Sequence, residues 1–315
     1  MNISFESNDF LSIGNVKVGH WTDNKGGTGV TVIHFPGSAS CGVDARGSAT
    51  GTREIDLLHP TKSVQYVDAL VLTGGSALGL STASGIAEIL RSRGQGYMTP
   101  GGPIPIVPAA VIFDLTVGDM VWPREQHGRL AIANADSDSF ATGNVGAGTG
   151  ATAGPGTFGC KTGLAVASVS RDNLKVGAIV IANPLGTIID ADGSPLAGLR
   201  ENDRLASSLD VLSLDNSAGQ NTVIGCIMTN AAFGKAEHCK VANMAHDGIA
   251  RSIYPSHTSH DGDVLFSSSC SSSQQYASVD LVGSLAAQTV AEAIRQAARQ
   301  AETAFGVPNL NPVLF

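Results

Sequence analysis

The chain has 315 residues, of which 43% are hydrophobic and 15% charged, and its formal net charge is −8. This composition favours a compact, well-buried protein and excludes an intrinsically disordered one. The acidic balance, the absence of a basic cluster and the 5% content of aromatic residues argue against nucleic-acid binding.

The cysteines and the N-terminal residues favour a cytoplasmic protein. The cysteines are odd in number and form no CxxC motif, which is typical of thiols in a reducing compartment. They are Cys41, Cys160, Cys226, Cys239 and Cys270. Residues 1–10 lack the basic and apolar regions of a signal peptide, and no apolar run reaches the roughly 18 residues that span a membrane. We therefore expect a cytoplasmic protein without a membrane partner.

Strand-like runs in the first half of the chain alternate with glycine-rich turns and one helical segment. This pattern predicts an α/β protein. The expected strands cover residues 11–19, 30–35, 67–73 and 109–115, the helix covers 77–93, and a loop covers 41–52.

The turn Gly74-Gly75-Ser76 lies between a predicted strand and a predicted helix, an arrangement that favours anion binding. Backbone N–H groups near Ser76 and Leu78 would then face a substrate pocket, with Gly75 shaping the turn. The alternative is a tight turn that serves packing alone. The residues leave both interpretations open.

The segment Gly154–Thr162 nearly matches a phosphate-binding loop. Its sequence differs from GxxxxGK[ST] by the extra Cys160 before Lys161. A nucleotide-binding protein is therefore one alternative function. Lys161 is either a surface residue or, in a pocket of low dielectric constant, a group that stabilises developing negative charge.

The second half of the chain predicts further strands over residues 165–169, 176–182 and 222–228, and helices over 232–253 and 278–304. Residues 188–220 resemble an insertion that ends in a flexible connector. Asn183 follows the strand 176–182, where its amide is either a donor to an oxyanion or part of a turn.

The border Asn221–Thr222 separates a polar run from an apolar strand. Thr222 either simply opens a strand or is a hidden nucleophile, released when the Asn221–Thr222 peptide bond breaks. In the second interpretation the freed α-amine, with an ordinary pKa of about 7.7–8.0, is the base for the hydroxyl of the same residue.

Two histidines and two aspartates gather in residues 256–266. His257, His260, Asp261 and Asp263 could hold a metal ion, or they could form a turn. In a third interpretation one of the two aspartates anchors the amine and hydroxyl of a released Thr222.

Several motifs together resemble the family of DmpA-like aminopeptidases and NylC-type 6-aminohexanoate-oligomer hydrolases. They are Asp44–Gly47 with Gly51–Glu54, Leu72–Leu80, Gly148–Ala151 with Lys161, Ala182–Pro184, Asn221–Thr222, Met244–Gly248 and Asp261–Asp263. The threonine after Asn221 is more similar to the nylon-hydrolase branch than to the serine-bearing aminopeptidases. The loop Gly47–Gly51 departs from the family pattern.

The resemblance implies an ornithine-acetyltransferase-like, four-layer α-β-β-α sandwich that covers residues 1–315 as a single domain. It also implies self-cleavage into residues 1–221 and 222–315, with Thr222 as nucleophile and Asn183 as oxyanion donor. Lys161 would be a partner in the pocket, and Asp261 and Asp263 would hold Thr222 and its amine.

We therefore expect a self-cleaving hydrolase of linear amide bonds in peptides or ω-amino-acid oligomers, without a metal or organic cofactor. The resemblance suggests a homo-oligomer, a tetramer of processed heterodimers. Besides the nucleotide-binding alternative, an acyltransferase or a non-catalytic protein of the same fold stays open.

Overall fold

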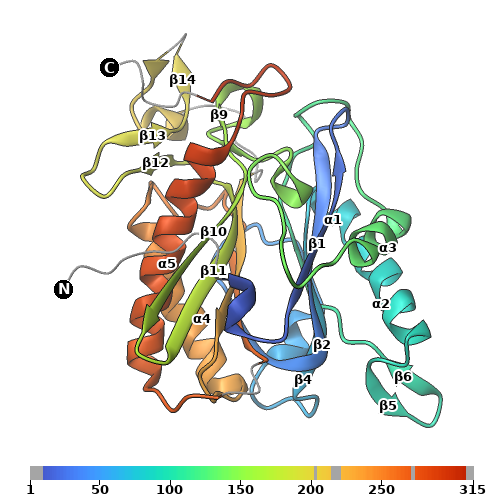
Figure 1. The fold of residues 1–315 in the computed structure, drawn as a ribbon. Coiled ribbons are helices and arrows are strands. Elements are labelled where there is room, and N and C mark those ends of the chain that lie inside the picture. The colour runs from blue at the N-terminus through green and yellow to red at the C-terminus, as the bar shows by residue number, and fades with distance from the viewer. Residues whose placement is uncertain (1–9, 202–203, 214–220, 271–273, 310–315) are drawn as a thin grey trace.

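The computed structural model describes residues 10–201, 204–213, 221–270 and 274–309. Within these residues the main sheet has nine strands in the order β10-β11-β16-β18-β2-β4-β7-β3, with β1 paired to β2 (Figure 1). Most neighbours are antiparallel, whereas β16–β18 and β4–β7 are parallel. The strands are β1 (Lys17–Asp23), β2 (Thr28–Ala45), β3 (Thr52–Arg53), β4 (Tyr66–Thr73), β7 (Ala109–Val111), β10 (Leu164–Arg171), β11 (Leu174–Asn183), β16 (Thr222–Thr229) and β18 (Val264–Ser269).

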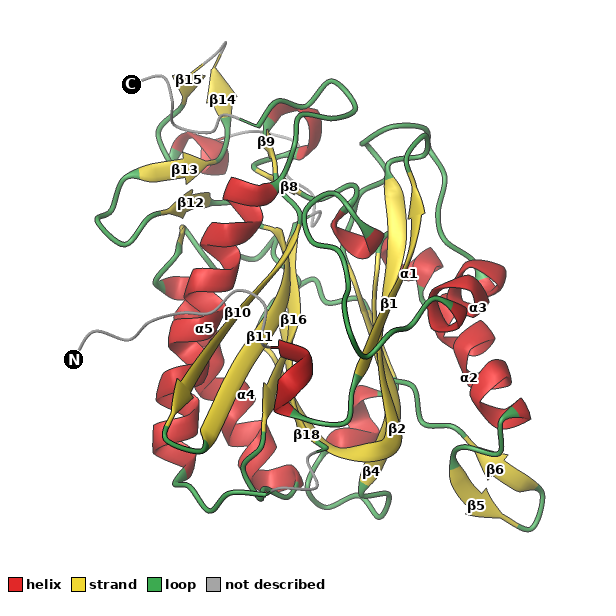
Figure 2. Ribbon diagram, viewed as in Figure 1, coloured by secondary structure: helices red, strands yellow, loops and turns green. Residues whose placement is uncertain are grey.

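Helices lie on two opposite sides of this strand system (Figure 2). Helix α5 packs on β10 and β11, and its neighbour α4 packs on β18 and β2, while α2 and α3 flank the part of the sheet that contains β1, β2 and β4. The helices are α1 (Ser76–Gly79), α2 (Thr82–Ser92), α3 (Glu125–Ala133), α4 (Lys235–Ala250) and α5 (Val279–Gln300). The 3₁₀ helices are η1 (Phe10–Ile13), η2 (Ile55–Leu58), η3 (Gly146–Gly148), η4 (Gly156–Phe158) and η5 (Asp210–Ser213).

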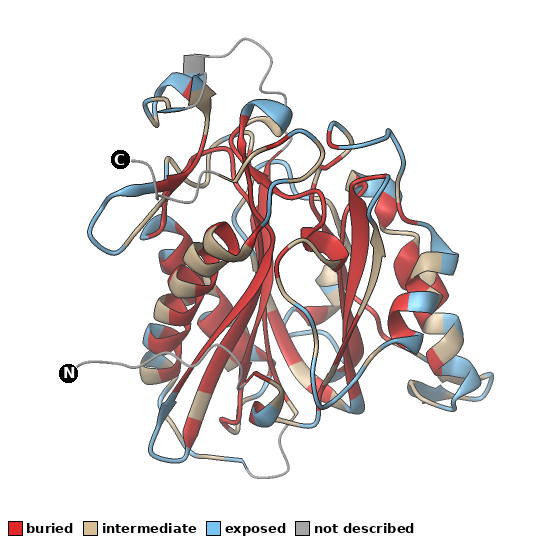
Figure 3. Cartoon of the chain, turned by 45° about the horizontal axis from the view of Figure 1, so that its top comes forward, coloured by how far each residue is buried: buried red, intermediate tan, exposed pale blue. Residues whose placement is uncertain are grey.

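Strand β11 is buried on both faces, which explains its continuous apolar sequence (Figure 3). Val180 belongs to the core under α4 and α5, whereas its neighbours Ile179 and Ile181 belong to a second core with residues of β2 and β4. A third core lies between α2, α3 and the other part of the sheet. The strands that carry the candidate site are therefore held between packed layers.

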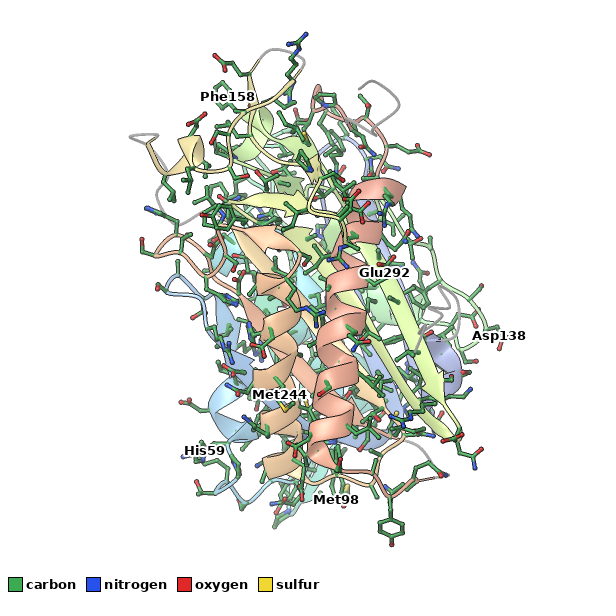
Figure 4. The ribbon with its side chains drawn as sticks, turned by 90° about the vertical axis from the view of Figure 1, so that its left-hand side faces the viewer. His59, Met98, Asp138, Phe158, Met244 and Glu292 are labelled. Carbon is green, nitrogen blue, oxygen red and sulfur yellow. The ribbon has the colours of Figure 1, made fainter. Side chains whose placement is uncertain are left out.

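Helices α4 and α5 pack closely along their length. Figure 4 shows them side by side, with Met244 on α4 and Glu292 on α5. A Cβ atom added at Gly248 of α4 would lie 2.3 Å from the carbonyl oxygen of Ala287 on α5. Glycine at this position thus permits the close approach of the two backbones.

Short strands form small sheets outside the main one. They are β5 (Tyr97–Thr99) with β6 (Gly102–Ile104), β8 (Thr152–Ala153) with β9 (Cys160–Lys161), β12 (Thr187–Ile189) with β13 (Pro195–Ala197) and β17 (Ile253–Tyr254), and β14 (Arg200–Glu201) with β15 (Arg204–Leu205). The insertion expected over 188–220 therefore contains ordered strands, and its residues 214–220 lie outside the described part.

The structure corrects several predicted boundaries. Residues 41–45, expected in a loop, continue β2, which passes an irregularity between His34 and Ala39. Residues 11–13 belong to η1 rather than to a strand. The expected helix 77–93 is divided into α1 and α2, and the strand that begins at residue 109 ends at residue 111.

The long C-terminal helix confirms its prediction. It spans Val279–Gln300, and the Ser278 hydroxyl caps it by accepting a hydrogen bond from the N–H of Leu281 at 3.2 Å. None of the helices in the described residues is long and apolar enough to cross a membrane.

Candidate active site

Asn221 and Thr222 lie at the start of β16, in the interior of the protein. Thr222 is 6% exposed and is the direct cross-strand partner of Asn183 on β11. Its hydroxyl donates a hydrogen bond to the carbonyl oxygen of Asn221 at 2.5 Å. The side-chain oxygen that would attack therefore lies beside the peptide bond that the sequence predicts to break.

The turn formed by Asp261, Gly262 and Asp263 holds this peptide segment on both sides of Thr222. The N–H of Gly262 donates to the Asn221 carbonyl oxygen at 2.9 Å. The N–H of Val223 donates to Asp263 Oδ1 at 2.8 Å. The residues before and after Thr222 are thus both anchored to one turn.

Asp263 connects the turn to His257. Its second oxygen, Oδ2, lies 2.7 Å from His257 Nδ1. Burial opposes the positive charge of His257, but the hydrogen bond and the negative charge of Asp263 outweigh it, so that the pKa of His257 is raised. The ring of His246 packs against that of His257, with centroids 5.1 Å apart. In the sequence His257 is a candidate metal ligand or turn residue, and its contact with Asp263 was not predicted.

Asp261 is held separately. Its Oδ2 accepts hydrogen bonds from the N–H of Thr258 at 2.8 Å and from its hydroxyl at 2.7 Å. Burial, together with the negative charge of Asp263, raises the pKa of Asp261. The two carboxylates therefore share a buried region but have different partners.

Asn183 reaches the same region from β11. Its Oδ1 accepts a hydrogen bond from the N–H of Thr152 at 2.9 Å, and its Nδ2 donates to the carbonyl of Phe113 at 3.3 Å. Side chains of directly opposite residues in an antiparallel pair lie on the same face, with Cβ atoms about 4.5–5.5 Å apart. Asn183 and Thr222 therefore face the same side of the sheet.

Lys161 is fully buried on β9, opposite Thr152 of β8. Its Nζ donates to the carbonyl oxygens of Gly148 at 3.2 Å and Ala151 at 2.9 Å, and to that of Thr162. Burial lowers the pKa of Lys161 to about 7, although the charge of Asp114 opposes this effect. An amine with this pKa is partly neutral at neutral pH.

Asp114 is a buried group of this region that sequence reasoning did not identify. Its carboxylate accepts hydrogen bonds from the hydroxyl of Thr28 and from the N–H of Gly75, both at 2.7 Å. Burial raises the pKa of Asp114 to about 6. The available signal was an acidic residue directly after the apolar run 109–113.

The turn Gly74–Ser76 uses its N–H groups within the fold. The N–H of Gly75 binds Asp114, and the N–H of Ser76 donates to the carbonyl of Ile112 at 2.9 Å. Gly75 and Ser76 both have positive φ, 83° and 52°, which fits a tight turn. Leu78 is 50% exposed. The N–H groups of Gly75 and Ser76 are therefore occupied within the fold, whereas the side chain of Leu78 is half exposed.

The phosphate-loop interpretation is wrong. In such a loop a helix follows the lysine, but here the lysine lies on β9 and strand β10 follows. The Nζ of Lys161 is bound to three carbonyl oxygens instead of facing a ligand cradle. In the described residues no group of three His, Cys, Asp or Glu side chains could hold a metal ion.

Comparisons with known proteins identify the family of this chain. The family described as peptidase family S58 matches residues 8–310. An uncharacterised aminopeptidase of Mycobacterium tuberculosis is 37% identical over 96% of this chain and 96% of its own length. A 6-aminohexanoate-oligomer endohydrolase of Kocuria sp. is 32% identical over 80% of this chain and 72% of its own length.

Solved structures show the same fold. The L-aminopeptidase D-Ala-esterase/amidase of Ochrobactrum anthropi, described as a variant of the Ntn hydrolase fold, superposes with a TM-score of 0.73 at 19% identity, over 96% of this chain and 89% of that one. A Burkholderia sp. β-aminopeptidase gives a TM-score of 0.72 at 19% identity, over 99% of this chain and 94% of that one. The chain therefore belongs to peptidase family S58 and is a hydrolase that acts on amide bonds.

Proposed function

We propose that this protein is a self-processing amidohydrolase whose nucleophile is Thr222. The observation that carries the proposal is the 2.5 Å hydrogen bond from the Thr222 hydroxyl to the carbonyl oxygen of Asn221. A hydroxyl held beside its own preceding carbonyl, on a strand anchored on both sides, has the proximity that an N→O acyl shift requires.

Self-cleavage would be an N→O acyl shift followed by hydrolysis. Thr222 Oγ1 bonds to the carbonyl carbon of Asn221, and the hydroxyl proton passes to the nitrogen of Thr222 as the C–N bond breaks. Water then hydrolyses the ester and leaves a carboxylate on Asn221 and a free α-amine on Thr222. The products are residues 1–221 and 222–315, which together form the single domain.

In the mature enzyme the α-amine of Thr222 would take the proton of its own hydroxyl as this attacks the substrate carbonyl. Asn183, on the same face of the sheet, would donate its amide to the oxyanion, and water would hydrolyse the acyl ester. Lys161, whose Nζ stays bound to three carbonyl oxygens, would contribute a positive charge to the pocket in its protonated form. Asp261 and Asp263 would hold the new N-terminus.

The arrangement of helices and strands supports an α-β-β-α sandwich. Helices lie outside both parts of the sheet, and the three hydrophobic cores lie between these layers. We propose linear peptides or oligoamides as substrates, because relatives include an aminopeptidase and a 6-aminohexanoate-oligomer endohydrolase. We also propose that the protein is cytoplasmic and forms a homo-oligomer, a tetramer of processed heterodimers.

A small panel of amides tests the function. The panel contains α-peptides, β-amino peptides and 6-aminohexanoate oligomers, and the products are identified by mass. We expect hydrolysis of at least one class by the wild type and none by Thr222→Ala. Thr229→Ala, at the other end of the same buried strand, is the matched control and should stay active. Equal activity of Thr222→Ala and the wild type would refute the proposal.

A further inference from the structure

The N–H of Gly262 points at the carbonyl of the bond that the proposed function breaks. We propose that this backbone N–H is the hydrogen-bond donor that stabilises the oxyanion during self-cleavage. The inference rests on the proposed function and adds to it a donor that belongs to no side chain.

The geometry places the donor on a reacting atom. The carbonyl oxygen of Asn221 accepts the N–H of Gly262 at 2.9 Å and the hydroxyl of Thr222 at 2.5 Å. When Thr222 Oγ1 bonds to the carbonyl carbon, this oxygen becomes the oxyanion. A donor already in place there stabilises the charge as it develops, without reorganisation.

The turn that carries the donor is fixed from its other side by residues after β2. The N–H of Ala49 donates to the carbonyl of Asp261 at 3.0 Å, and the N–H of Arg46 donates to that of Asp263 at 3.0 Å. Residue 221 also forms a parallel bridge with residue 261. The position of the Gly262 N–H is therefore set by its neighbours on both sides.

The residue type fits this role. A Cβ atom at position 262 would lie 2.5 Å from the carbonyl oxygen of Ala49 and 2.8 Å from Thr222 Oγ1. Both distances are shorter than a carbon atom tolerates, so a side chain would displace either the turn or the nucleophile. Only glycine brings the N–H this close to the carbonyl and leaves the hydroxyl in place.

The same donor has a use after processing. The ester formed in self-cleavage joins an acyl group to Thr222 Oγ1, and the acyl-enzyme of substrate hydrolysis is the same functional group on the same oxygen. The tetrahedral intermediates of both reactions therefore place an oxyanion beside Thr222. Gly262 would serve both reactions, together with Asn183 in the second.

Replacement of the Gly262 N–H by an ester oxygen removes the donor without adding a side chain, and it also weakens the Asp261 carbonyl as the acceptor of the Ala49 N–H. Glycolic acid is inserted at position 262 of the full chain by cell-free translation, and self-cleavage is followed by electrophoresis with mass identification of the fragments. Gly143 is the matched control, because it is also buried and its N–H also donates one hydrogen bond, to the carbonyl of Leu164 at 2.7 Å.

We expect the ester at position 262 to slow self-cleavage about a hundredfold, the usual effect of removing one oxyanion donor. The ester at 143 should leave the rate within about threefold of the wild type, since the N–H of Gly143 is bound to the carbonyl of Leu164 and not to the carbonyl that is attacked. Equal rates for the two esters would overturn the inference. A wild-type chain that is never cut would instead refute the proposed function, so the two failures are distinguishable.

A second measurement applies if the ester-containing chain does not fold. In the uncut Thr222→Ala chain, hydrogen exchange of the Gly262 amide is measured by NMR. We expect strong protection of this amide, because its hydrogen bond to Asn221 does not need the hydroxyl. Exchange at the rate of an unstructured glycine would contradict the assigned donor.

Discussion

Replacing Lys161 by methionine should change how the stability of the protein depends on pH. The side chain is fully buried, and burial lowers its pKa from the ordinary 10.5 to about 7. Between these two pH values the unfolded chain binds a proton at Lys161 that the folded chain does not bind. The free energy of unfolding should therefore rise with pH in this window and fall as the pH falls toward 7.

The magnitude follows from the two pKa values. A lowering from 10.5 to about 7 corresponds to about 5 kcal/mol over the whole window, at about 1.4 kcal/mol per pH unit. From pH 7.5 to 9 the contribution is about 2 kcal/mol. Methionine does not titrate and leaves buried carbonyl oxygens without a donor, three relative to the protonated amine and two relative to the neutral amine, each a loss of about 1–3 kcal/mol.

Urea unfolding of the two chains tests this reasoning, with Thr222→Ala in both to keep them uncut. We expect the parent to gain about 2 kcal/mol relative to Lys161→Met between pH 7.5 and 9, because only the parent carries the titrating amine. Other titrating groups are common to both chains; Asp114 interacts with Lys161, and its pKa of about 6 lies below the measured range. A stability difference that is independent of pH would refute the burial of a neutral amine at this position.

Further substitutions test the surroundings of the site. As the pH falls from about 6 to 3.8, the folded carboxyl of Asp114 binds a proton before the unfolded one does, and the parent gains about 3 kcal/mol of stability. Asp114→Asn should lack this gain, and identical pH profiles of urea unfolding for the two chains would contradict this. Asp263→Asn should slow self-cleavage at least about tenfold, as followed by electrophoresis. The substitution turns one of the two carboxylate oxygens, which face Val223 and His257, into an NH2 group that cannot accept a hydrogen bond. An unchanged rate would show that this anchor is dispensable. Ser278→Ala should lower the stability by about 1 kcal/mol through the lost helix cap and leave cleavage unchanged, and a cleavage defect would contradict its purely structural role.

The sequence predicted the elements whose pattern is local. The helix at 279–300 has a capping serine and an apolar face, and β4 is a continuous apolar run, so both were found close to their observed bounds. Strand β2 was cut short because Pro36 and Gly37 interrupt its alternation. Its pairing with β4 shifts register at this irregularity, which sequence periodicity does not reveal.

Residues of the candidate site could be predicted from the sequence where the residue type itself suggests a chemical role. Thr222 and Asn183 were identified at the ends of strands, but their direct pairing depends on the order of β11 and β16 in the sheet. This order is a result of tertiary packing and leaves no local pattern. The burial of Lys161 under three carbonyl oxygens is likewise a property of the fold.

Groups whose partners lie in distant segments of the chain were not predictable from the sequence. Glycine in an Asp-Gly-Asp turn is common, and the role that we propose for Gly262 depends on the position of one N–H. Asp114 was missed since its partners, Thr28 and Gly75, are 86 and 39 residues away in the chain. The contacts of both residues exist only because the fold brings distant segments of the chain together.

The intact mass of purified protein tests the central claim most directly. We expect the wild type to consist of two associated fragments, residues 1–221 and 222–315, with threonine at the N-terminus of the second. Thr222→Ala should give one full-length mass under the same conditions. A wild-type protein that hydrolyses amides while it shows only the full-length mass would contradict the account.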